Sequence, residues 1–202
     1  MTSEFLNVSR ETIEKLRAFE RLAKKWTTKI NLVSKESAEN LWDRHILDSV
    51  QVYNAASNDW RHWVDLGSGG GFPGVVVAIL AGEHTDAHKV TLIESDARKC
   101  AFLRAALRKT GANAHVLTQR IEELDPQEAD IVSARALADL TSLLGFTERH
   151  LRRGGTAIFP KGVRWRQEVE AAKSLWKFDF EPVRSDLAAD AVILKIKGVS
   201  RV

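Results

Sequence analysis

A glycine-rich segment between two apolar stretches constrains the fold of this chain more than any other feature. Five glycines fall within residues 67–74, after the apolar run Trp63–Leu66 and before the apolar run Val75–Ala81. Glycine reaches positive φ angles without strain and lets a ligand approach the backbone closely. Five glycines are more than a tight turn needs, so the pattern predicts a ligand-binding loop between a strand and a helix.

Short apolar runs alternate with helix-length segments beyond residue 61, which predicts a parallel sheet with helices on both faces. The predicted strands are Trp63–Leu66, Lys89–Glu94, His115–Thr118, Asp130–Ala134 and Thr156–Pro160, and the predicted helices are 73–81, 97–110, 136–150 and 164–177. The last two apolar runs, Phe178–Val183 and Ala191–Lys197, leave no room for a crossover helix and predict a terminal antiparallel hairpin. The predicted fold is therefore a doubly wound α/β sheet of seven strands.

The first part of the chain has a different pattern. Apolar residues recur at helical spacing from Ser9 to Ile30, and again over about 38–56. We therefore expect residues 1–60 to form a helical extension and residues 61–202 to form one compact ligand-binding domain.

Composition limits the setting in which the chain works. It has 202 residues, a net charge of +3 and one cysteine, so it can form neither an internal disulfide nor a cysteine-based zinc site. The start lacks the pattern of a signal peptide, and the longest apolar run is too short to span a bilayer. We expect a cytoplasmic, monomeric protein without a metal. Residues 151–202 carry eleven basic and six acidic groups, which is a weak indication of a polyanionic partner.

The glycine loop leaves two cofactors open. Residues 69–74 fit the G-x-G-x-x-G pattern of dinucleotide-binding folds, which keeps an NAD-type oxidoreductase as the alternative. Asp65, however, precedes Gly67 by two residues, and a carboxylate favours the ammonium and sulfonium groups of S-adenosylmethionine over a pyrophosphate. The predicted terminal hairpin is also atypical of the dinucleotide fold. We therefore favour S-adenosylmethionine, with contacts from Asp65 and from the loop glycines Gly67, Gly69 and Gly71.

Two later strand ends supply further cofactor candidates. Glu94 closes the second predicted strand, 23 residues beyond Gly71, where a carboxylate can accept hydrogen bonds from both ribose hydroxyls. Ile121 and Glu122 follow the third strand, where Ile121 can pack on the adenine and a backbone group can read its amine.

The end of the fourth strand, Ser133-Ala134-Arg135-Ala136, excludes several kinds of methyl acceptor. It lacks the Asn/Asp-Pro-Pro-aromatic motif of exocyclic amine methylation. Cys100 lies in a predicted helix and is a poor nucleophile for carbon methylation, and no carboxylate cluster suggests a catalytic metal. Guanine N7 remains, because its lone pair carries no proton and needs no general base.

The chain resembles the bacterial small-subunit ribosomal RNA guanine-N7 methyltransferases, also called glucose-inhibited division protein B. The resemblance spans nearly the whole chain and is most specific in Arg44-His45-Ile46-Leu47-Asp48-Ser49 and Gly71-Phe72-Pro73-Gly74. It is also carried by blocks 31–34, 92–95, 99–104, 120–123, 133–136 and 160–162.

This resemblance implies a class I, Rossmann-like methyltransferase fold acting on a guanine in the decoding-region hairpin of 16S ribosomal RNA. S-adenosylmethionine would be the cofactor and S-adenosylhomocysteine the product, with cofactor roles for Gly67, Phe72, Ile121, Glu122 and Arg135. The chain departs from the family at Glu94, where Asp is frequent, and at Gly70, where some members have Pro. Naked 16S RNA and the 30S particle both remain open as substrates, and so does a non-catalytic RNA-binding module.

Basic residues supply the RNA-binding candidates. The resemblance favours Arg44 and His45 as a rim beside the site, and Arg135 and His45 as positioning residues, whereas residue types alone favour an ordinary Arg44–Asp48 surface pair. Lys161, Arg164 and Arg166 follow the fifth strand and could bind phosphate, although each alone could be an ordinary surface charge.

Overall fold

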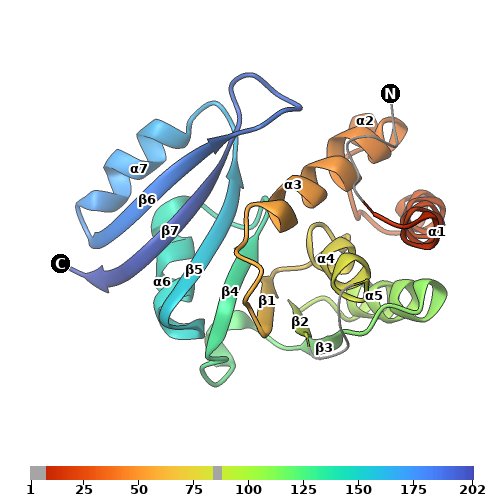
Figure 1. Ribbon diagram of the computed structural model, residues 1–202, viewed down its shortest axis with the longest axis horizontal. Helices are drawn as coiled ribbons and strands as arrows, with labels where there is room; N and C mark the ends of the chain where they lie inside the picture. Colours follow the sequence, from red (N-terminus) through yellow and green to blue (C-terminus); the bar gives the residue numbers. More distant parts are fainter. Residues whose placement is uncertain (1–7, 84–87) are drawn as a thin grey trace.

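The computed structural model describes residues 8–83 and 88–202. Seven strands form one sheet in the order β3-β2-β1-β4-β5-β7-β6 (Figure 1). Strands β1 to β5 are parallel, whereas β7 runs antiparallel to both of its neighbours, β5 and β6. The predicted seven-stranded sheet with a terminal antiparallel hairpin is confirmed. The strands are β1 (His62–Leu66), β2 (Lys89–Glu94), β3 (His115–Thr118), β4 (Ala129–Ala134), β5 (Leu151–Lys161), β6 (Trp176–Arg184) and β7 (Val192–Arg201).

Helices cover both faces of this sheet because neighbouring residues along each strand point to opposite sides. Trp63 and Ile131 belong to the core shared with α1, α3, α4 and α5, whereas Val64 and Val132 belong to the core shared with α6 and α7. The helices are α1 (Arg10–Thr27), α2 (Lys35–Glu39), α3 (Asp48–Asn54), α4 (Gly74–Ala81), α5 (Ala97–Thr110), α6 (Leu140–His150) and α7 (Trp165–Lys173), with a 3₁₀ turn η2 (Ile121–Glu123).

The segment before the sheet is helical, but the second predicted helix is interrupted. A short helix, α2, precedes a π-helical turn, η1 (Trp42–Leu47), which runs directly into α3. Such π turns are rare and occur frequently at functional sites. Helix α1 packs its buried face, including Leu16 and Phe19, onto the sheet domain beside α5.

Two predicted boundaries are wrong in ways that matter for the site. The helix expected over 136–150 begins only at Leu140, where the Asp139 side chain caps it by accepting from the Ser142 N–H. Residues 135–139 form a loop instead, with Ala136 at a φ of 52°. The helix expected over 164–177 ends at Lys173, and Trp176 already belongs to β6. In the part of the chain that is described, no helix combines the length and apolar character needed to cross a bilayer.

Candidate functional site

The glycine loop between β1 and α4 has a backbone conformation that residues with a side chain rarely adopt. Gly67, Gly69 and Gly71 have φ angles of 61°, 49° and 80°. A Cβ atom on Gly71 would lie 2.7 Å from a Val75 methyl and 2.9 Å from the Phe19 ring. Positive φ and close packing therefore both require glycine at position 71.

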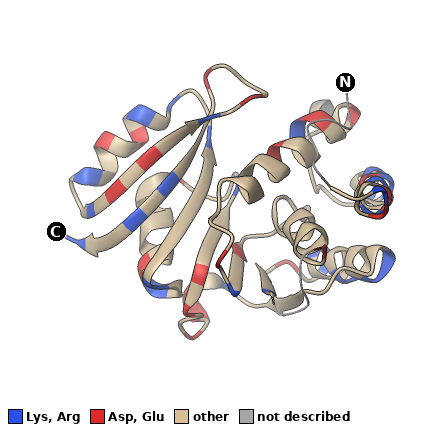
Figure 2. Ribbon diagram, viewed as in Figure 1, with Lys and Arg blue, Asp and Glu red and all other residues tan. Residues whose placement is uncertain are grey.

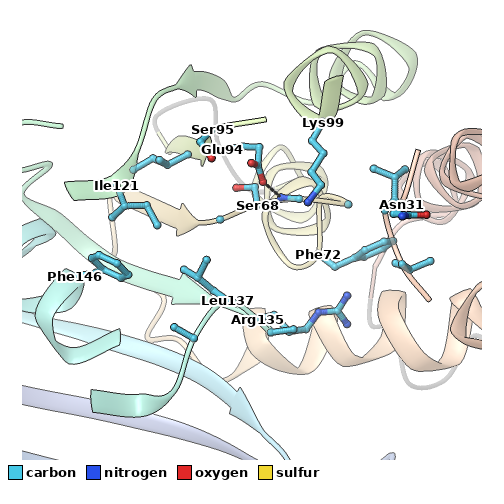
Figure 3. Close-up of a pocket in the computed structure, with 18 of the residues that line it drawn as sticks. Asn31, Ser68, Phe72, Glu94, Ser95, Lys99, Ile121, Arg135, Leu137 and Phe146 are labelled. Atoms are coloured by element: carbon cyan, nitrogen blue, oxygen red, sulfur yellow. Dashed lines mark hydrogen bonds between the residues drawn. The ribbon is translucent and has the colours of Figure 1, made fainter. Parts of the chain in front are cut away.

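Glu94 at the end of β2 holds this loop. Its Oε2 accepts from the Gly69 N–H at 3.0 Å (Figure 3), and its Oε1 accepts from the Asp96 N–H at 2.8 Å. A carboxylate has about four acceptor positions, so two remain after these bonds. The Glu94 side chain is buried yet lines the adjoining cavity, which leaves it able to accept hydrogen bonds from a ligand there.

A cavity of about 1010 Å³ opens at the carboxyl ends of β1 to β4, where parallel sheets bind their ligands. Eight of the predicted site residues line it, and most of its wall comes from the loops that follow the strands. These eight are His45, Gly67, Gly69, Phe72, Glu94, Ile121, Glu122 and Arg135. The side chains of Phe72, Ile121, Leu137 and Phe146 give it apolar surfaces (Figure 3).

Asp65 and Gly71 were predicted to contact a cofactor, but neither lines this cavity. Asp65 is buried behind the glycine loop, where its Oδ1 accepts from the Ser133 hydroxyl at 2.7 Å. Burial raises the pKa of Asp65 to about 6, although hydrogen bonds from Ser133 and Ser68 oppose the shift. Any effect of Asp65 on a ligand must therefore act through the loop backbone, and Gly71 shapes that loop.

His45 and Arg135 meet over the ring of Phe72. The His45 ring stacks on Phe72 at 5.0 Å, and the Arg135 guanidinium lies 5.1 Å from the same ring centre. Burial lowers the pKa of His45 to about 3, and repulsion by Arg135 and Arg44 adds to this effect. His45 is therefore neutral at physiological pH and cannot serve as a proton donor.

Arg135 also joins two elements that are distant in the sequence. Its guanidinium donates to Asp48 Oδ2 and to the Arg44 carbonyl, each at 3.4 Å. The Arg44–Asp48 pair that residue types alone suggested is therefore replaced by an Arg135–Asp48 pair. The Arg44 side chain is exposed and does not line the cavity.

The predicted phosphate-binding residues after β5 lie outside the cavity. Lys161 is largely buried, and its Nζ donates to Glu168 at 2.7 Å and to the Ala138 carbonyl at 3.1 Å. This geometry favours a structural role for Lys161 over a phosphate contact. Arg164 and Arg166 are exposed, and Arg166 lies over the Trp165 ring at 4.4 Å. Trp165 itself is buried, which favours core packing over base stacking.

Several lining residues were not among the predicted site residues. Asn31 comes from the segment after α1, and its block 31–34 carries the family resemblance, so this signal was present in the sequence. Leu137 gave no such signal, because it was assigned to a helix. In the structure it lies over Gly67, where an added Cβ would be 2.6 Å from its methyl group. In the described ranges 8–83 and 88–202, no cluster of three potential metal ligands occurs.

Sequence comparison identifies related proteins over nearly the whole chain. The model of the family rRNA small subunit methyltransferase G, GidB, matches residues 12–189. The Ribosomal RNA small subunit methyltransferase G of Ruegeria pomeroyi is 57% identical over 198 residues, covering 98% of this chain and 96% of that protein. A protein of the same name from Cereibacter sphaeroides is 46% identical over 197 residues, with the same coverage.

Structural comparison gives the fold class. An O-methyltransferase from Bacillus cereus, solved in complex with SAH, matches with a TM-score of 0.56 at 13% identity, over 97% of this chain and 94% of that one. A ribosomal protein L11 methylase from Lactobacillus delbrueckii matches with a TM-score of 0.60 at 17% identity, over 78% of each chain. These neighbours confirm the predicted class I methyltransferase fold, and the family match argues against the oxidoreductase alternative.

Proposed function

Because the chain belongs to the rRNA small subunit methyltransferase G family, we propose that it transfers a methyl group from S-adenosylmethionine to guanine N7 in 16S ribosomal RNA. The proposal that the target guanine lies in the decoding-region hairpin follows from the sequence resemblance. The observation that carries the proposal is the cavity in which the glycine loop, Glu94 and Ile121 meet.

The residues that line the cavity suit S-adenosylmethionine in their hydrogen-bonding and apolar groups. Glu94 has acceptor positions free for the two ribose hydroxyls. Ile121 lines the cavity as an apolar side chain, and its carbonyl is fixed by the buried His150 at 2.9 Å, so it offers a rigid surface to the adenine. Because Gly67 and Gly69 have no side chains, the methionine portion of the cofactor can lie close to their backbone at the edge of the sheet. When bound, the cofactor supplies an electrophilic methyl group on a sulfonium.

The residues near Phe72 suit methylation of N7. Guanine N7 bears a lone pair and no proton, so the protein has only to position the base and exclude water. Its pKa of about 3 makes His45 a weak base, which is consistent with this chemistry because no side chain has to accept a proton. Arg135 and His45 would position the reacting groups through the surface that they form on Phe72.

RNA would reach this site over a basic surface. Lys99 lines the cavity, and Arg98, Arg104 and Arg108 continue along α5, whose ribbon is coloured blue at its basic residues in Figure 2. Phosphate contacts of this kind contribute affinity without reading sequence. We propose that the protein acts in the cytoplasm as a monomer, with residues 1–60 as a helical extension of the methyltransferase domain 61–202.

The test is methyl transfer to ribosomal particles. 30S particles and naked 16S RNA from cells that lack this protein are incubated with labelled S-adenosylmethionine, and the modified base is mapped. We expect labelled 7-methylguanine from one of the two substrates. Binding of the cofactor without any methyl transfer to either would instead support a non-catalytic RNA-binding module. Calorimetric binding of NAD(H) in place of S-adenosylmethionine would refute the proposal.

A further inference from the structure

A second cavity of about 370 Å³ adjoins the first one. Arg135, Ala136 and Ala138 line both cavities, so the loop after β4 forms their shared wall. The rest of the second cavity is formed by the carboxyl end of β5, the start of β7, and the side chains of Asp48 and Glu168. Its place at the strand ends, next to the proposed cofactor site, is where a methyl acceptor would enter.

The charges in this second cavity cancel. Arg135 pairs with Asp48, and Lys161 pairs with Glu168. A phosphate group would meet two carboxylates together with the two cations, and it would gain little from such a balanced set. The cavity is therefore suited to a neutral group that carries hydrogen-bond donors and acceptors, such as a nucleobase turned out of its stack.

The two ion pairs differ in how well their carboxylates are satisfied. Glu168 Oε2 accepts from Lys161 at 2.7 Å and from the Leu140 N–H at 2.9 Å. Asp48 has a single described side-chain partner, the Arg135 guanidinium, at the longer distance of 3.4 Å. Burial raises the pKa of Asp48 despite that cation, and the side chain is only 22% exposed. Asp48 thus has unused acceptor capacity in a partly desolvated cavity.

Guanine is the nucleobase that best complements such a carboxylate. Its Watson–Crick edge presents two adjacent donors, N1–H and the exocyclic N2 amine, which a carboxylate can accept together. Adenine and cytosine each present an unprotonated ring nitrogen at that edge, which would repel the Asp48 oxygens. Hypoxanthine, the base of inosine, carries hydrogen in place of the N2 amine of guanine, so it lacks the N2 donor alone and tests the contact directly.

We propose that the second cavity holds the acceptor guanine and that Asp48 selects it by accepting hydrogen bonds from N1–H and the N2 amine. This inference rests on the proposed function and adds a specificity-determining residue to it. N7 lies on the other ring of the purine, away from this edge. Recognition by Asp48 therefore leaves N7 open to the methyl donor in the adjoining cavity.

The test compares guanosine with inosine at the mapped methylation position. 16S RNA ligated from two transcripts carries either nucleoside there and is presented naked and as reconstituted 30S particles. Wild-type protein should methylate the guanosine substrate at least about 10-fold faster than the inosine substrate in kcat/KM, because a buried carboxylate loses a donor. Asp48→Asn should lower kcat/KM for guanosine by about 10–100-fold and reduce the discrimination to below about 3-fold.

The matched control is Asp43→Asn, which alters an exposed carboxylate on the π-helical turn that precedes Asp48, outside both cavities. It should keep both the wild-type discrimination and the wild-type calorimetric affinity for S-adenosylmethionine. Equal wild-type rates for guanosine and inosine would overturn the role of Asp48 whether or not the Asp48 variant folds. Absence of any methyl transfer by the wild type would instead refute the proposed function.

Discussion

Two loops at the carboxyl edge of the sheet, one after β1 and one after β4, are built on different principles. The loop after β1 is shaped by its own backbone, with three glycines at positive φ and one side chain, Glu94, holding it. The loop after β4 is held by contacts with distant elements. Arg135 donates to Asp48 at one end of the loop, and Lys161 donates to the Ala138 carbonyl at the other.

The two loops differ in this way because the loop after β1 would bind the cofactor, whereas the loop after β4 would bind the acceptor. A cofactor that is the same in many enzymes can be bound by a loop of fixed backbone geometry, which the local sequence encodes. An acceptor differs between enzymes, and here its proposed cavity is enclosed by residues from α3, β5, α7 and β7 that are far apart in the chain. Substitutions in the two loops should therefore change stability and ligand binding in different ways.

The largest effect on the free energy of unfolding is expected from Gly71→Ala. The new Cβ would add a clash with Val75 and Phe19 to the strain of a φ of 80°, so we expect a loss of about 2–4 kcal/mol in the free energy of unfolding. Urea denaturation measures it. Gly111→Ala is the matched control, because Gly111 has a φ of 67° but nothing within 4 Å of an added Cβ. It should lose only about 1 kcal/mol, and equal losses would show that packing at Gly71 is unimportant.

Lys161→Met tests the loop after β4, because the Lys161 side chain holds this loop through the Ala138 carbonyl. Removing the cation leaves Glu168 without its charged partner, so we expect about 2 kcal/mol of destabilisation in urea. The salt dependence of RNA binding should not change, because the charge of Lys161 is already balanced by Glu168. Lys173→Met removes an exposed pair and should cost less than about 0.5 kcal/mol. A shallower salt dependence in Lys161→Met would show that Lys161 contacts phosphate after all.

Glu94→Ala should weaken S-adenosylmethionine binding by about 1–3 kcal/mol in calorimetry, because the ribose loses its acceptor. It also releases the Gly69 N–H, so the glycine loop should become more susceptible to proteolysis. Glu123→Ala, an exposed carboxylate outside the cavity, provides the comparison and should bind the cofactor normally. Unchanged affinity in Glu94→Ala would remove Glu94 from the cofactor site.

The smallest expected effect is on how the free energy of unfolding depends on pH. The folded protein keeps His45 neutral down to a pKa of about 3, whereas the unfolded chain protonates near its ordinary value. The unfolded state therefore binds more protons below about pH 6.5, and the free energy of unfolding should fall as the pH is lowered. His45→Phe should make this decline shallower in urea titrations between about pH 7 and pH 5. His62 and His150 also have lowered pKa values, so some decline should remain, and an unaltered slope would contradict the burial of His45.

The sequence was sufficient for the sheet and for most of the first cavity, because both depend on local patterns. Strands β2 and β3 and helix α5 begin and end at the predicted residues, and Glu94 lies at the predicted strand end. The sequence was insufficient for residues 135–139. The helical spacing of apolar side chains in α6 extends to these residues, so the sequence predicted a helix there. The bonds from Lys161 and Glu168 to Ala138 and Leu140 instead fix a loop, and such long-range contacts leave no local signal.

The position of β7 has a consequence for how the protein is made. This strand is the last in the chain, yet it lies between β5 and β6 and supplies Val192 and Ile193 to the wall of the second cavity. Strand β6 leaves the ribosome first and has no place in the sheet until β7 follows it. A nascent chain can therefore assemble the glycine loop and its first cavity early, but it gains the proposed base pocket only after β7 has been made. Selection of an acceptor would then become possible only once the strand that completes the sheet has been translated.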